Sequence, residues 1–229
     1  MMDGYSAAQI RDAEAPHLLA GEPLMALAAH GLAEEIRSVL RSRPGPVAGA
    51  RVVLLVGSGN NGGDALFAGA ELAAEGVGVA IVPTAGSVHV DGLAAALAAG
   101  AVVQHVVGIE SAAAAVEGAD VVVDGILGTG AAASPALRGP ARTIVEAILP
   151  LVLSPRGPAV VAVDLPSGIN PDNGTVPDPL VLPADVTVTF GGCKAGLLLE
   201  PARGLAGAVR LVDIGLGPDL ARMEPLVRQ

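Results

Sequence analysis

Seven short apolar segments, each able to form a buried strand, alternate along the chain with segments of helical character. The first, residues 51–57 (RVVLLVG), is apolar without interruption, as in strands covered on both faces. Strands separated by helices need right-handed crossovers and form a mainly parallel sheet between two helical layers. The sequence therefore predicts an α/β fold, a Rossmann-like three-layer αβα sandwich of about seven to eight strands. The predicted strands lie at residues 51–57, 77–83, 101–107, 119–127, 158–166, 184–190 and 207–215.

A chain of 229 residues is expected to form a single domain over residues 1–229. Residues 1–49 are expected to supply N-terminal helices, and residues 50–217 the Rossmann-like core. Within the first part, Leu24–Leu40 has the apolar periodicity of an amphipathic helix. The helix after the first strand is expected to run from Asp64 to Glu75, because a glycine follows it.

Composition excludes several classes of function. The net charge of −10 argues against a protein that binds duplex nucleic acid, which needs a basic surface. No uninterrupted apolar stretch is long enough to span a bilayer, so no membrane association is expected. The single cysteine, Cys193, cannot form an internal disulfide, and a reducing cytoplasm is the expected location.

Three glycine-containing loops follow predicted strands, and each contains at least one aspartate. They are Gly57–Asp64, Asp124–Ser134 and Asp164–Gly174. Ligands of open α/β sheets bind beyond the carboxyl ends of the strands, so these loops are expected to meet at one site. The first two loops lead to expected helix starts, where free backbone amides can hold phosphate.

The first loop, GSGNNGGD, contains the G-x-G-x-x-G pattern of dinucleotide-binding proteins. That pattern alone is weak evidence, because a glycine turn before a helix also matches it. A nicotinamide-dependent dehydrogenase needs in addition an acidic residue at the end of the second strand, where it binds ribose hydroxyls. Here that strand ends in AIVPTAGS, without an acid. An ordinary dehydrogenase is therefore disfavoured.

Four segments together resemble the NAD(P)H-hydrate epimerase family, the YjeF N-terminal domain. They are GSGNNGGD, VVDGILGTG, VAVDLPSGINPDNG and the stretch TVTFGGCKAGLLLEPARGLAGAVRLVDIGL. The resemblance covers roughly residues 52–217 and implies an eight-stranded sandwich, a homodimer and a bound potassium ion, one per subunit. The implied activity interconverts the R and S forms of hydrated NADH and NADPH (NADHX and NADPHX). It also implies a possible fused or separate ADP/ATP-dependent NAD(P)H-hydrate dehydratase.

The resemblance assigns residues to three roles. Potassium would be held by Asn61, Asp124 and Ser167, while Asp164 would face the reacting ring and Lys194 matches a lysine of the family. Substrate would be bound by Asp164 and by residues of two loops. The loop residues would be Asn60, Asn61, Gly62, Gly63 and Asp64 in the first loop, and Gly128, Thr129, Gly130, Ala131, Ala132, Ala133 and Ser134 in the second.

The implied chemistry suits an aspartate. The hydrate carries a hydroxyl on a ring carbon bonded to nitrogen, and this hydroxyl can leave through an iminium-like state before water returns on the other face. The departing hydroxyl needs a proton donor, the returning water needs a base, and a nearby anion stabilises the cationic ring. We therefore expect Asp164 to be the acid–base residue. Ser167 lies in P-S-G rather than in a G-x-S-x-G elbow, so a hydrolase triad is not expected.

Two parts of the chain depart from the family's pattern. Ala65 replaces a usual glycine, and Ala26 and Leu27 replace polar residues expected in the N-terminal helix, so no site residue is assigned before Asn60. The altered helix leaves open a non-catalytic nucleotide-binding or scaffold protein, and a nucleotide-dependent oxidoreductase is the other alternative. Each candidate also has a structural explanation, since Asn, Asp and Ser shape turns and a lysine such as Lys194 is usually solvated.

Overall fold

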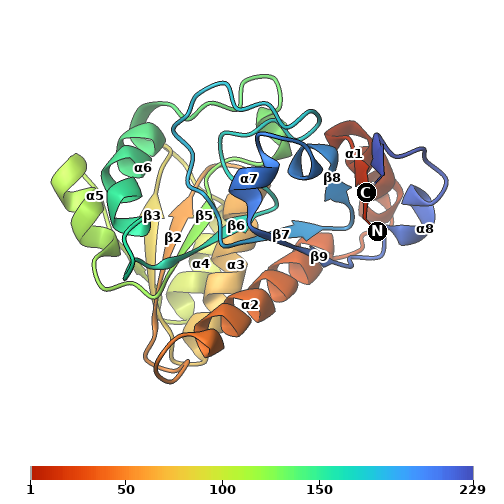
Figure 1. Ribbon diagram of the computed structural model, residues 1–229. Helices are drawn as coiled ribbons and strands as arrows, with labels where there is room; N and C mark the ends of the chain where they lie inside the picture. Colours follow the sequence, from red (N-terminus) through yellow and green to blue (C-terminus); the bar gives the residue numbers. More distant parts are fainter. Residues whose placement is uncertain (1, 229) are drawn as a thin grey trace.

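The computed structural model describes residues 2–228 and has the predicted three layers (Figure 1). Its central sheet is built, in spatial order, from β4 (Val102–Val103), β3 (Gly78–Pro83), β2 (Arg51–Val56), β5 (Val121–Gly125), β6 (Ala159–Val163), β7 (Val186–Phe190) and β9 (Ala208–Val212). Every neighbouring pair in this sheet is parallel. The α/β class and the parallel sheet are confirmed, with seven strands rather than the eight implied by the resemblance.

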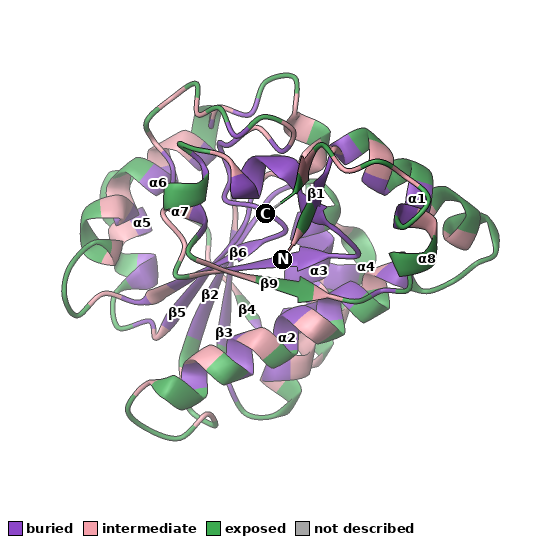
Figure 2. Ribbon diagram, turned by 45° about the vertical axis from the view of Figure 1, so that its right-hand side comes forward, coloured by how far each residue is buried: buried purple, intermediate pink, exposed green. Residues whose placement is uncertain are grey.

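Helices cover both faces of the sheet because consecutive residues of each strand point to opposite sides. In β2, Leu54 packs with Leu32 and Leu66 of the helices on one face, whereas Leu55 packs with Ile144 on the other. The five inner strands are accordingly buried along most of their length, whereas the edge strands β4 and β9 are not (Figure 2). The first face carries α2 (Leu24–Ser42), α3 (Asn60–Ala74) and α4 (Val90–Ala98), and the second carries α5 (Ile109–Val116) and α6 (Gly139–Val152).

Several predicted boundaries differ from the structure, and two of the differences have a clear physical reason. The strand expected at residues 101–107 is only Val102–Val103, because β4 is an edge strand and the polar residues that follow it leave the sheet. The helix expected from Asp64 begins four residues earlier, at Asn60. Its first turn contains asparagines and glycines, which are poor helix formers, but close packing of this turn overrides their propensity.

A second, three-stranded sheet was not predicted. It consists of β10 (Val227–Arg228), β1 (Asp3–Tyr5) and β8 (Cys193–Lys194), in that order, so both ends of the described chain lie side by side (Figure 1). β1 leads into α1 (Ala7–Leu19), which begins with a capping box between Ser6 and Gln9. The predicted N-terminal helices are therefore α1 and α2. The remaining short elements are α7 (Arg203–Ala206), α8 (Gly217–Leu220) and the 3-10 helices Thr129–Ala131 and Ala195–Leu198.

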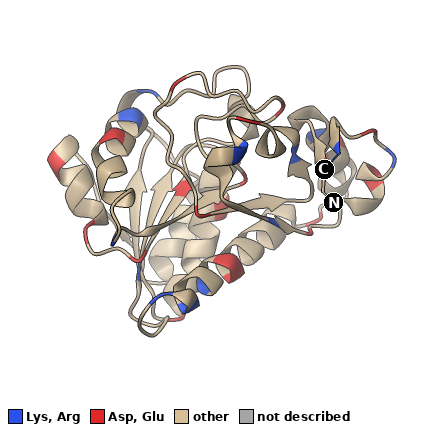
Figure 3. Ribbon diagram, viewed as in Figure 1, with Lys and Arg blue, Asp and Glu red and all other residues tan. Residues whose placement is uncertain are grey.

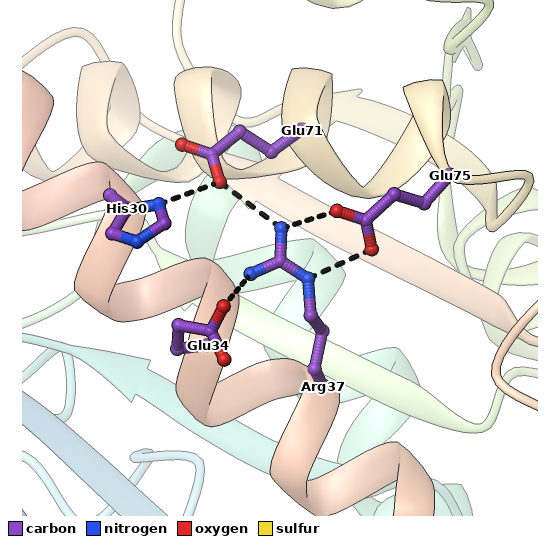
Figure 4. A network of polar contacts seen from close by, with 5 residues as sticks. All are labelled: His30, Glu34, Arg37, Glu71 and Glu75. Atoms are coloured by element: carbon purple, nitrogen blue, oxygen red, sulfur yellow. Dashed lines mark hydrogen bonds and ion pairs between the residues drawn. The ribbon is translucent and has the colours of Figure 1, made fainter.

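A network of charged side chains joins α2 to α3 (Figure 4). The buried Arg37 guanidinium of α2 contacts Glu34 at 2.7 Å, Glu71 at 3.1 Å and Glu75 at 2.7 Å, and His30 contacts Glu71 at 3.1 Å. Two parallel bonds from one guanidinium to Glu75 fix the relative position of the helices. The network thereby holds α3, whose first turn carries predicted site residues.

The order of the strands predicts where a ligand binds. From β2 the chain continues to β3 and β4 on one side and then returns to β5 and continues through β6, β7 and β9 on the other. The crevice between β2 and β5 is therefore the topological switch point, the usual ligand position of open α/β sheets. The loops Gly57–Asp64 and Asp124–Ser134 leave the sheet at this point.

The surface carries charge of both signs. In Figure 3 the basic residues are distributed over several helices and loops rather than gathered on one element. Across residues 2–228, no helix combines the length and apolar character needed to cross a membrane.

Candidate active site

A cavity of about 450 Å³ lies at the carboxyl ends of the central strands, a volume typical of small-molecule sites. It brings together residues from the first turn of α3, from the loop after β5, and from the ends of β6 and β7. The predicted site residues that line it are Asn60, Asn61, Asp64, Thr129, Gly130, Asp164 and Lys194.

One wall of the cavity comes from the two N-terminal helices, to which no site residue was assigned from the sequence. The cavity-lining residues of α1 are spaced so that they lie on one face of the helix, and α2 contributes further lining residues, among them Met25. Ala26 and Leu27, the two departures noted above, are exposed and are absent from this lining. The α1 residues are Ile10, Arg11, Glu14, Ala15 and Leu18.

Asp164 and Lys194 form a buried ion pair through Asp164 Oδ1 and Lys194 Nζ. The side chains are almost fully enclosed, with Lys194 only 2% exposed. Lys194 Nζ also donates to Thr189 Oγ1 at 3.2 Å and to the Phe190 carbonyl at 3.1 Å, and Thr189 Oγ1 donates to Asp164 Oδ1 at 3.0 Å. A buried ion pair requires such additional hydrogen bonds to compensate for lost hydration.

The backbone of Asp164 turns sharply where β6 ends. Its φ is 69°, in the left-handed region that non-glycine residues seldom adopt and that aspartate and asparagine tolerate best. The Asp164 amide donates to the Val188 carbonyl at 2.7 Å, and the Leu165 amide donates to the Val163 carbonyl at 2.8 Å. These bonds fix the turn, and the Asp164 side chain lines the cavity.

Asp64 differs from Asp164 because it has no such partner. Its side chain is 6% exposed and lines the cavity, yet it forms no hydrogen bond or ion pair with any residue in the described part of the chain. Burial raises the pKa of Asp64 to about 8, and the nearby Asp164 carboxylate adds to this effect. Lys194 lowers the pKa by less than these two raise it, and Glu14 raises it by a still smaller amount. Burial likewise raises the pKa of Glu14.

Asp124 lies next to the last residue of β5 and is fully buried. Its carboxylate accepts hydrogen bonds from the Ser167 amide at 2.8 Å, from Ser167 Oγ at 2.6 Å and from the Ile126 amide at 3.3 Å. Burial raises the pKa of Asp124, which the hydrogen bonds from Ser167 and Ile126 oppose. Within residues 2–228, no basic side chain contacts it.

The three predicted cation ligands meet around the Leu127 backbone. Asn61 Nδ2 donates to the Leu127 carbonyl at 3.2 Å and to the Val163 carbonyl at 2.6 Å, while the Leu127 amide donates to Ser167 Oγ at 2.8 Å. A Cβ atom on Gly128 would overlap the Asn61 side chain, so glycine is required there for the loop to approach. Loops after β2, β5 and β6 are thus joined at one point.

The second substrate loop lies between two cavities. Thr129 and Gly130 line the main cavity, whereas Ser134 lines a neighbouring one of about 230 Å³, together with Gly57 and Ser58 of the first loop. Both loops thus contribute to both cavities. The remaining predicted substrate residues, which line neither cavity, are Gly62, Gly63, Gly128, Ala131, Ala132 and Ala133.

The departure at Ala65 is accommodated by packing. Ala65 is fully buried in α3, and its methyl group lies where a Cβ on Gly125 would be in close contact. The absence of a side chain on Gly125 leaves room for the alanine. The substitution therefore leaves the approach of α3 to β5 intact.

A doubly wound parallel sheet, with two glycine-rich loops and a buried Asp–Lys pair at its carboxyl edge, defines a Rossmann-like protein with a cavity at the switch point. Residues 21–196 match the family model described as YjeF-related protein N-terminus, and the chain belongs to this family.

Several relatives match nearly the whole chain. It is 54% identical to a protein of Clavibacter michiganensis subsp. michiganensis named NAD(P)H-hydrate epimerase, over 99% of this chain and 95% of the relative. It is 40% identical to the bifunctional NAD(P)H-hydrate repair enzyme Nnr of Mycobacterium tuberculosis, over 97% of this chain and 43% of the relative. The crystal structure of yeast YNL200c has the same fold, with a TM-score of 0.77 at 20% identity over 100% of this chain and 97% of the yeast chain.

Proposed function

We propose that this protein is an NAD(P)H-hydrate epimerase, which interconverts the R and S forms of hydrated NADH and NADPH. The observation that carries the proposal is the buried Asp164–Lys194 pair in a cavity bounded by two glycine-rich loops. Its support from relatives is the 54% identity, over nearly the full length, to a protein of that name. The hydrated ring lies beside Asp164, and the substrate phosphates lie along Gly128–Ser134.

In the mechanism we propose, the ring hydroxyl takes up a proton and leaves as water with the electrons of its C–O bond. The lone pair of the ring nitrogen then forms a C=N bond, and the Asp164 carboxylate stabilises the resulting iminium. A water molecule adds to the opposite face and gives its proton to Asp164. Lys194 holds the Asp164 carboxylate in position.

The reaction is tested by incubating the pure protein with one epimer of hydrated NADH in water enriched in oxygen-18. We expect the other epimer to form faster than without enzyme, with one solvent oxygen on the ring carbon for each conversion. Conversion that retains the original oxygen would contradict the iminium route. Oxidation or reduction of ordinary NADH would favour the oxidoreductase instead, and binding without conversion would favour the scaffold.

A potassium ion, one per subunit, belongs to the proposal and would be held by Asn61, Asp124 and Ser167. The available ligands are hard oxygens with a single carboxylate, a set that suits a monovalent cation better than magnesium or zinc. The buried Asp124 carboxyl group has no basic partner in the described part of the chain, so a cation would supply the countercharge for its ionised form. A half-turn of the Asn61 side-chain amide would exchange its nitrogen and oxygen and point the oxygen toward the proposed cation. The ion would stabilise the junction of the three loops.

We expect the protein to melt at a higher temperature in potassium chloride than in tetramethylammonium chloride of equal concentration. A ligand that binds only the folded state stabilises it by about 1.4 kcal/mol at ten times its Kd. Asp124→Asn should abolish this difference, whereas Glu146→Gln, on the exposed side of α6, should preserve it. Equal melting temperatures in both salts for the parent protein would contradict the cation site.

Three further assignments stay predictions. The homodimer rests on the resemblance, and the cytoplasmic location on the single cysteine and the lack of an apolar span. A dehydratase partner, fused or separate, follows from the bifunctional relatives, of which this chain matches less than half the length. Such a partner would consume one epimer and make the exchange useful.

A further inference from the structure

Exchange between epimers poses a geometric problem that one carboxylate cannot solve. The hydroxyl leaves from one face of the ring and must gain a proton there, while water adds to the opposite face and must lose one there. A single side chain lies on one face only. If the proposed function is correct, the site needs a second proton-transfer group across the ring from Asp164.

We propose that Asp64 is this second catalytic residue, the proton donor to the departing hydroxyl, acting across the ring from Asp164. The two aspartates line the same cavity from different elements, Asp64 from the first turns of α3 after β2 and Asp164 from the end of β6. β5 lies between those two strands. β2 and β6 are therefore two strand spacings apart, about 10 Å, so the elements that carry the two carboxyl groups reach the cavity from different strand ends.

Asp64 is also the carboxyl group of the cavity best suited to hold a proton. The charged groups that face it are Asp164 after β6, Lys194 on β8, and Glu14 and Arg11 on α1. The Lys194 ammonium is already bound to Asp164, Arg11 is exposed, and Glu14 is only half-buried. Asp64 is enclosed and has no bonded partner in the described chain, consistent with its pKa of about 8. The neutral acid is therefore its stable form at neutral pH.

The proton balance of the cycle follows from this pair. Asp64 gives its proton to the hydroxyl, which leaves as water, and the incoming water gives a proton to Asp164. The enzyme then holds ionised Asp64 and protonated Asp164, the arrangement that suits the reverse reaction on the other epimer. Lys194 beside Asp164 disfavours its protonated form, so the proton returns to Asp64 through water in the cavity.

Rates of Asp64 variants test the assignment. We expect Asp64→Asn to lower kcat for epimer exchange by about 100- to 10,000-fold, the usual contribution of a general acid, with little change in KM. Asp64→Glu should retain part of the rate, and Glu146→Gln should match the parent. If the parent is active and Asp64→Asn is equally active, the catalytic role of Asp64 is overturned, while the proposed epimerase function is not affected. A parent without exchange activity would instead contradict the proposed function.

The pH profile of the rate provides a readout that a purely structural role would not move. Because Asp64 must be protonated, kcat/KM of the parent should fall as the pH rises through about 8. In Asp64→Glu this fall in kcat/KM, the high-pH limb of the profile, should occur at a different pH. In Asp64→Asn the residual activity should show no such high-pH limb. The same high-pH limb in Asp64→Asn would overturn the proposal.

Folding provides a test that does not depend on activity. The pKa of Asp64 is raised from its ordinary 3.8 to about 8, so between these values the folded protein binds one more proton than the unfolded chain. The stabilisation is complete below pH 3.8 and is lost as the pH rises to about 8. Across that window the parent should therefore lose stability relative to Asp64→Asn. Parallel pH dependences of unfolding would show that Asp64 holds no proton and would overturn the proposal, even for an active enzyme.

Discussion

Asp164→Asn is expected to slow enzyme-catalysed exchange of hydrated NADH epimers by about 100- to 10,000-fold, because general acid–base groups contribute about that much to rate. Asparagine keeps the size of the side chain and can still accept a hydrogen bond from Lys194, but it cannot accept the proton of the incoming water. It also tolerates the left-handed backbone at this position, so the fold should be preserved. The expected loss is therefore in kcat rather than in binding.

The measurement follows the separated epimers by chromatography and subtracts the rate without enzyme, because the hydrate can epimerise slowly by itself. Glu146→Gln serves as the matched control, since it removes one exposed carboxylate from α6, away from the cavity. An Asp164→Asn protein that exchanges epimers at nearly the parent rate would remove Asp164 from the mechanism. Lys194 or a bound water would then be the better candidate.

Lys194→Met is expected to destabilise the protein by about 3–5 kcal/mol, the effect of removing one member of a buried ion pair. Methionine has a similar length, but it leaves the Asp164 carboxylate in the cavity without its countercharge. The Phe190 carbonyl also loses a donor. Exchange activity should fall as well, because Asp164 is no longer held in place.

Denaturant unfolding of the two single variants and the double variant separates this explanation from a simple packing defect. If the penalty comes from the uncompensated charge, adding Asp164→Asn to Lys194→Met should restore part of the lost stability, a coupling typical of contacting residues. Strictly additive losses would mean that the two side chains do not stabilise each other. Exchange activity should stay low in all three variants.

The parts of the fold that were predictable are those with a local pattern. Continuous apolar segments identified the strands, since a strand buried on both faces needs no polar residue. The three-stranded sheet of β1, β8 and β10 has no such signal, because its strands contain two or three residues and pair across most of the chain. The start of α3 at Asn60 likewise depends on tertiary packing that overrides local propensity.

The candidate site can likewise be divided into features that the sequence predicted and features that it did not. Its glycine-rich loops and aspartates were predictable because they follow buried strands directly. The wall formed by Glu14 and its neighbours was missed, since the docking of α1 over the cavity depends on contacts distant in sequence. Helical spacing of the α1 residues was the available signal, but it does not identify what the helix faces. That Asp64 has no hydrogen-bond or ion-pair partner among residues 2–228 is likewise visible only in three dimensions.

The pairing of β1 with both β8 and β10 has a consequence for how the molecule assembles. Tyr5 pairs with Lys194 and Gly4 with Val227, so the segment that carries the lysine is bound to residues far before it in the sequence and, through them, to residues that follow it. The central strands β2, β3 and β5 can pair as soon as they leave the ribosome. The lysine-bearing segment acquires its complete surroundings only when β1, β8 and β10, which are distant in sequence, have paired, so we expect the site to be completed after the scaffold has formed.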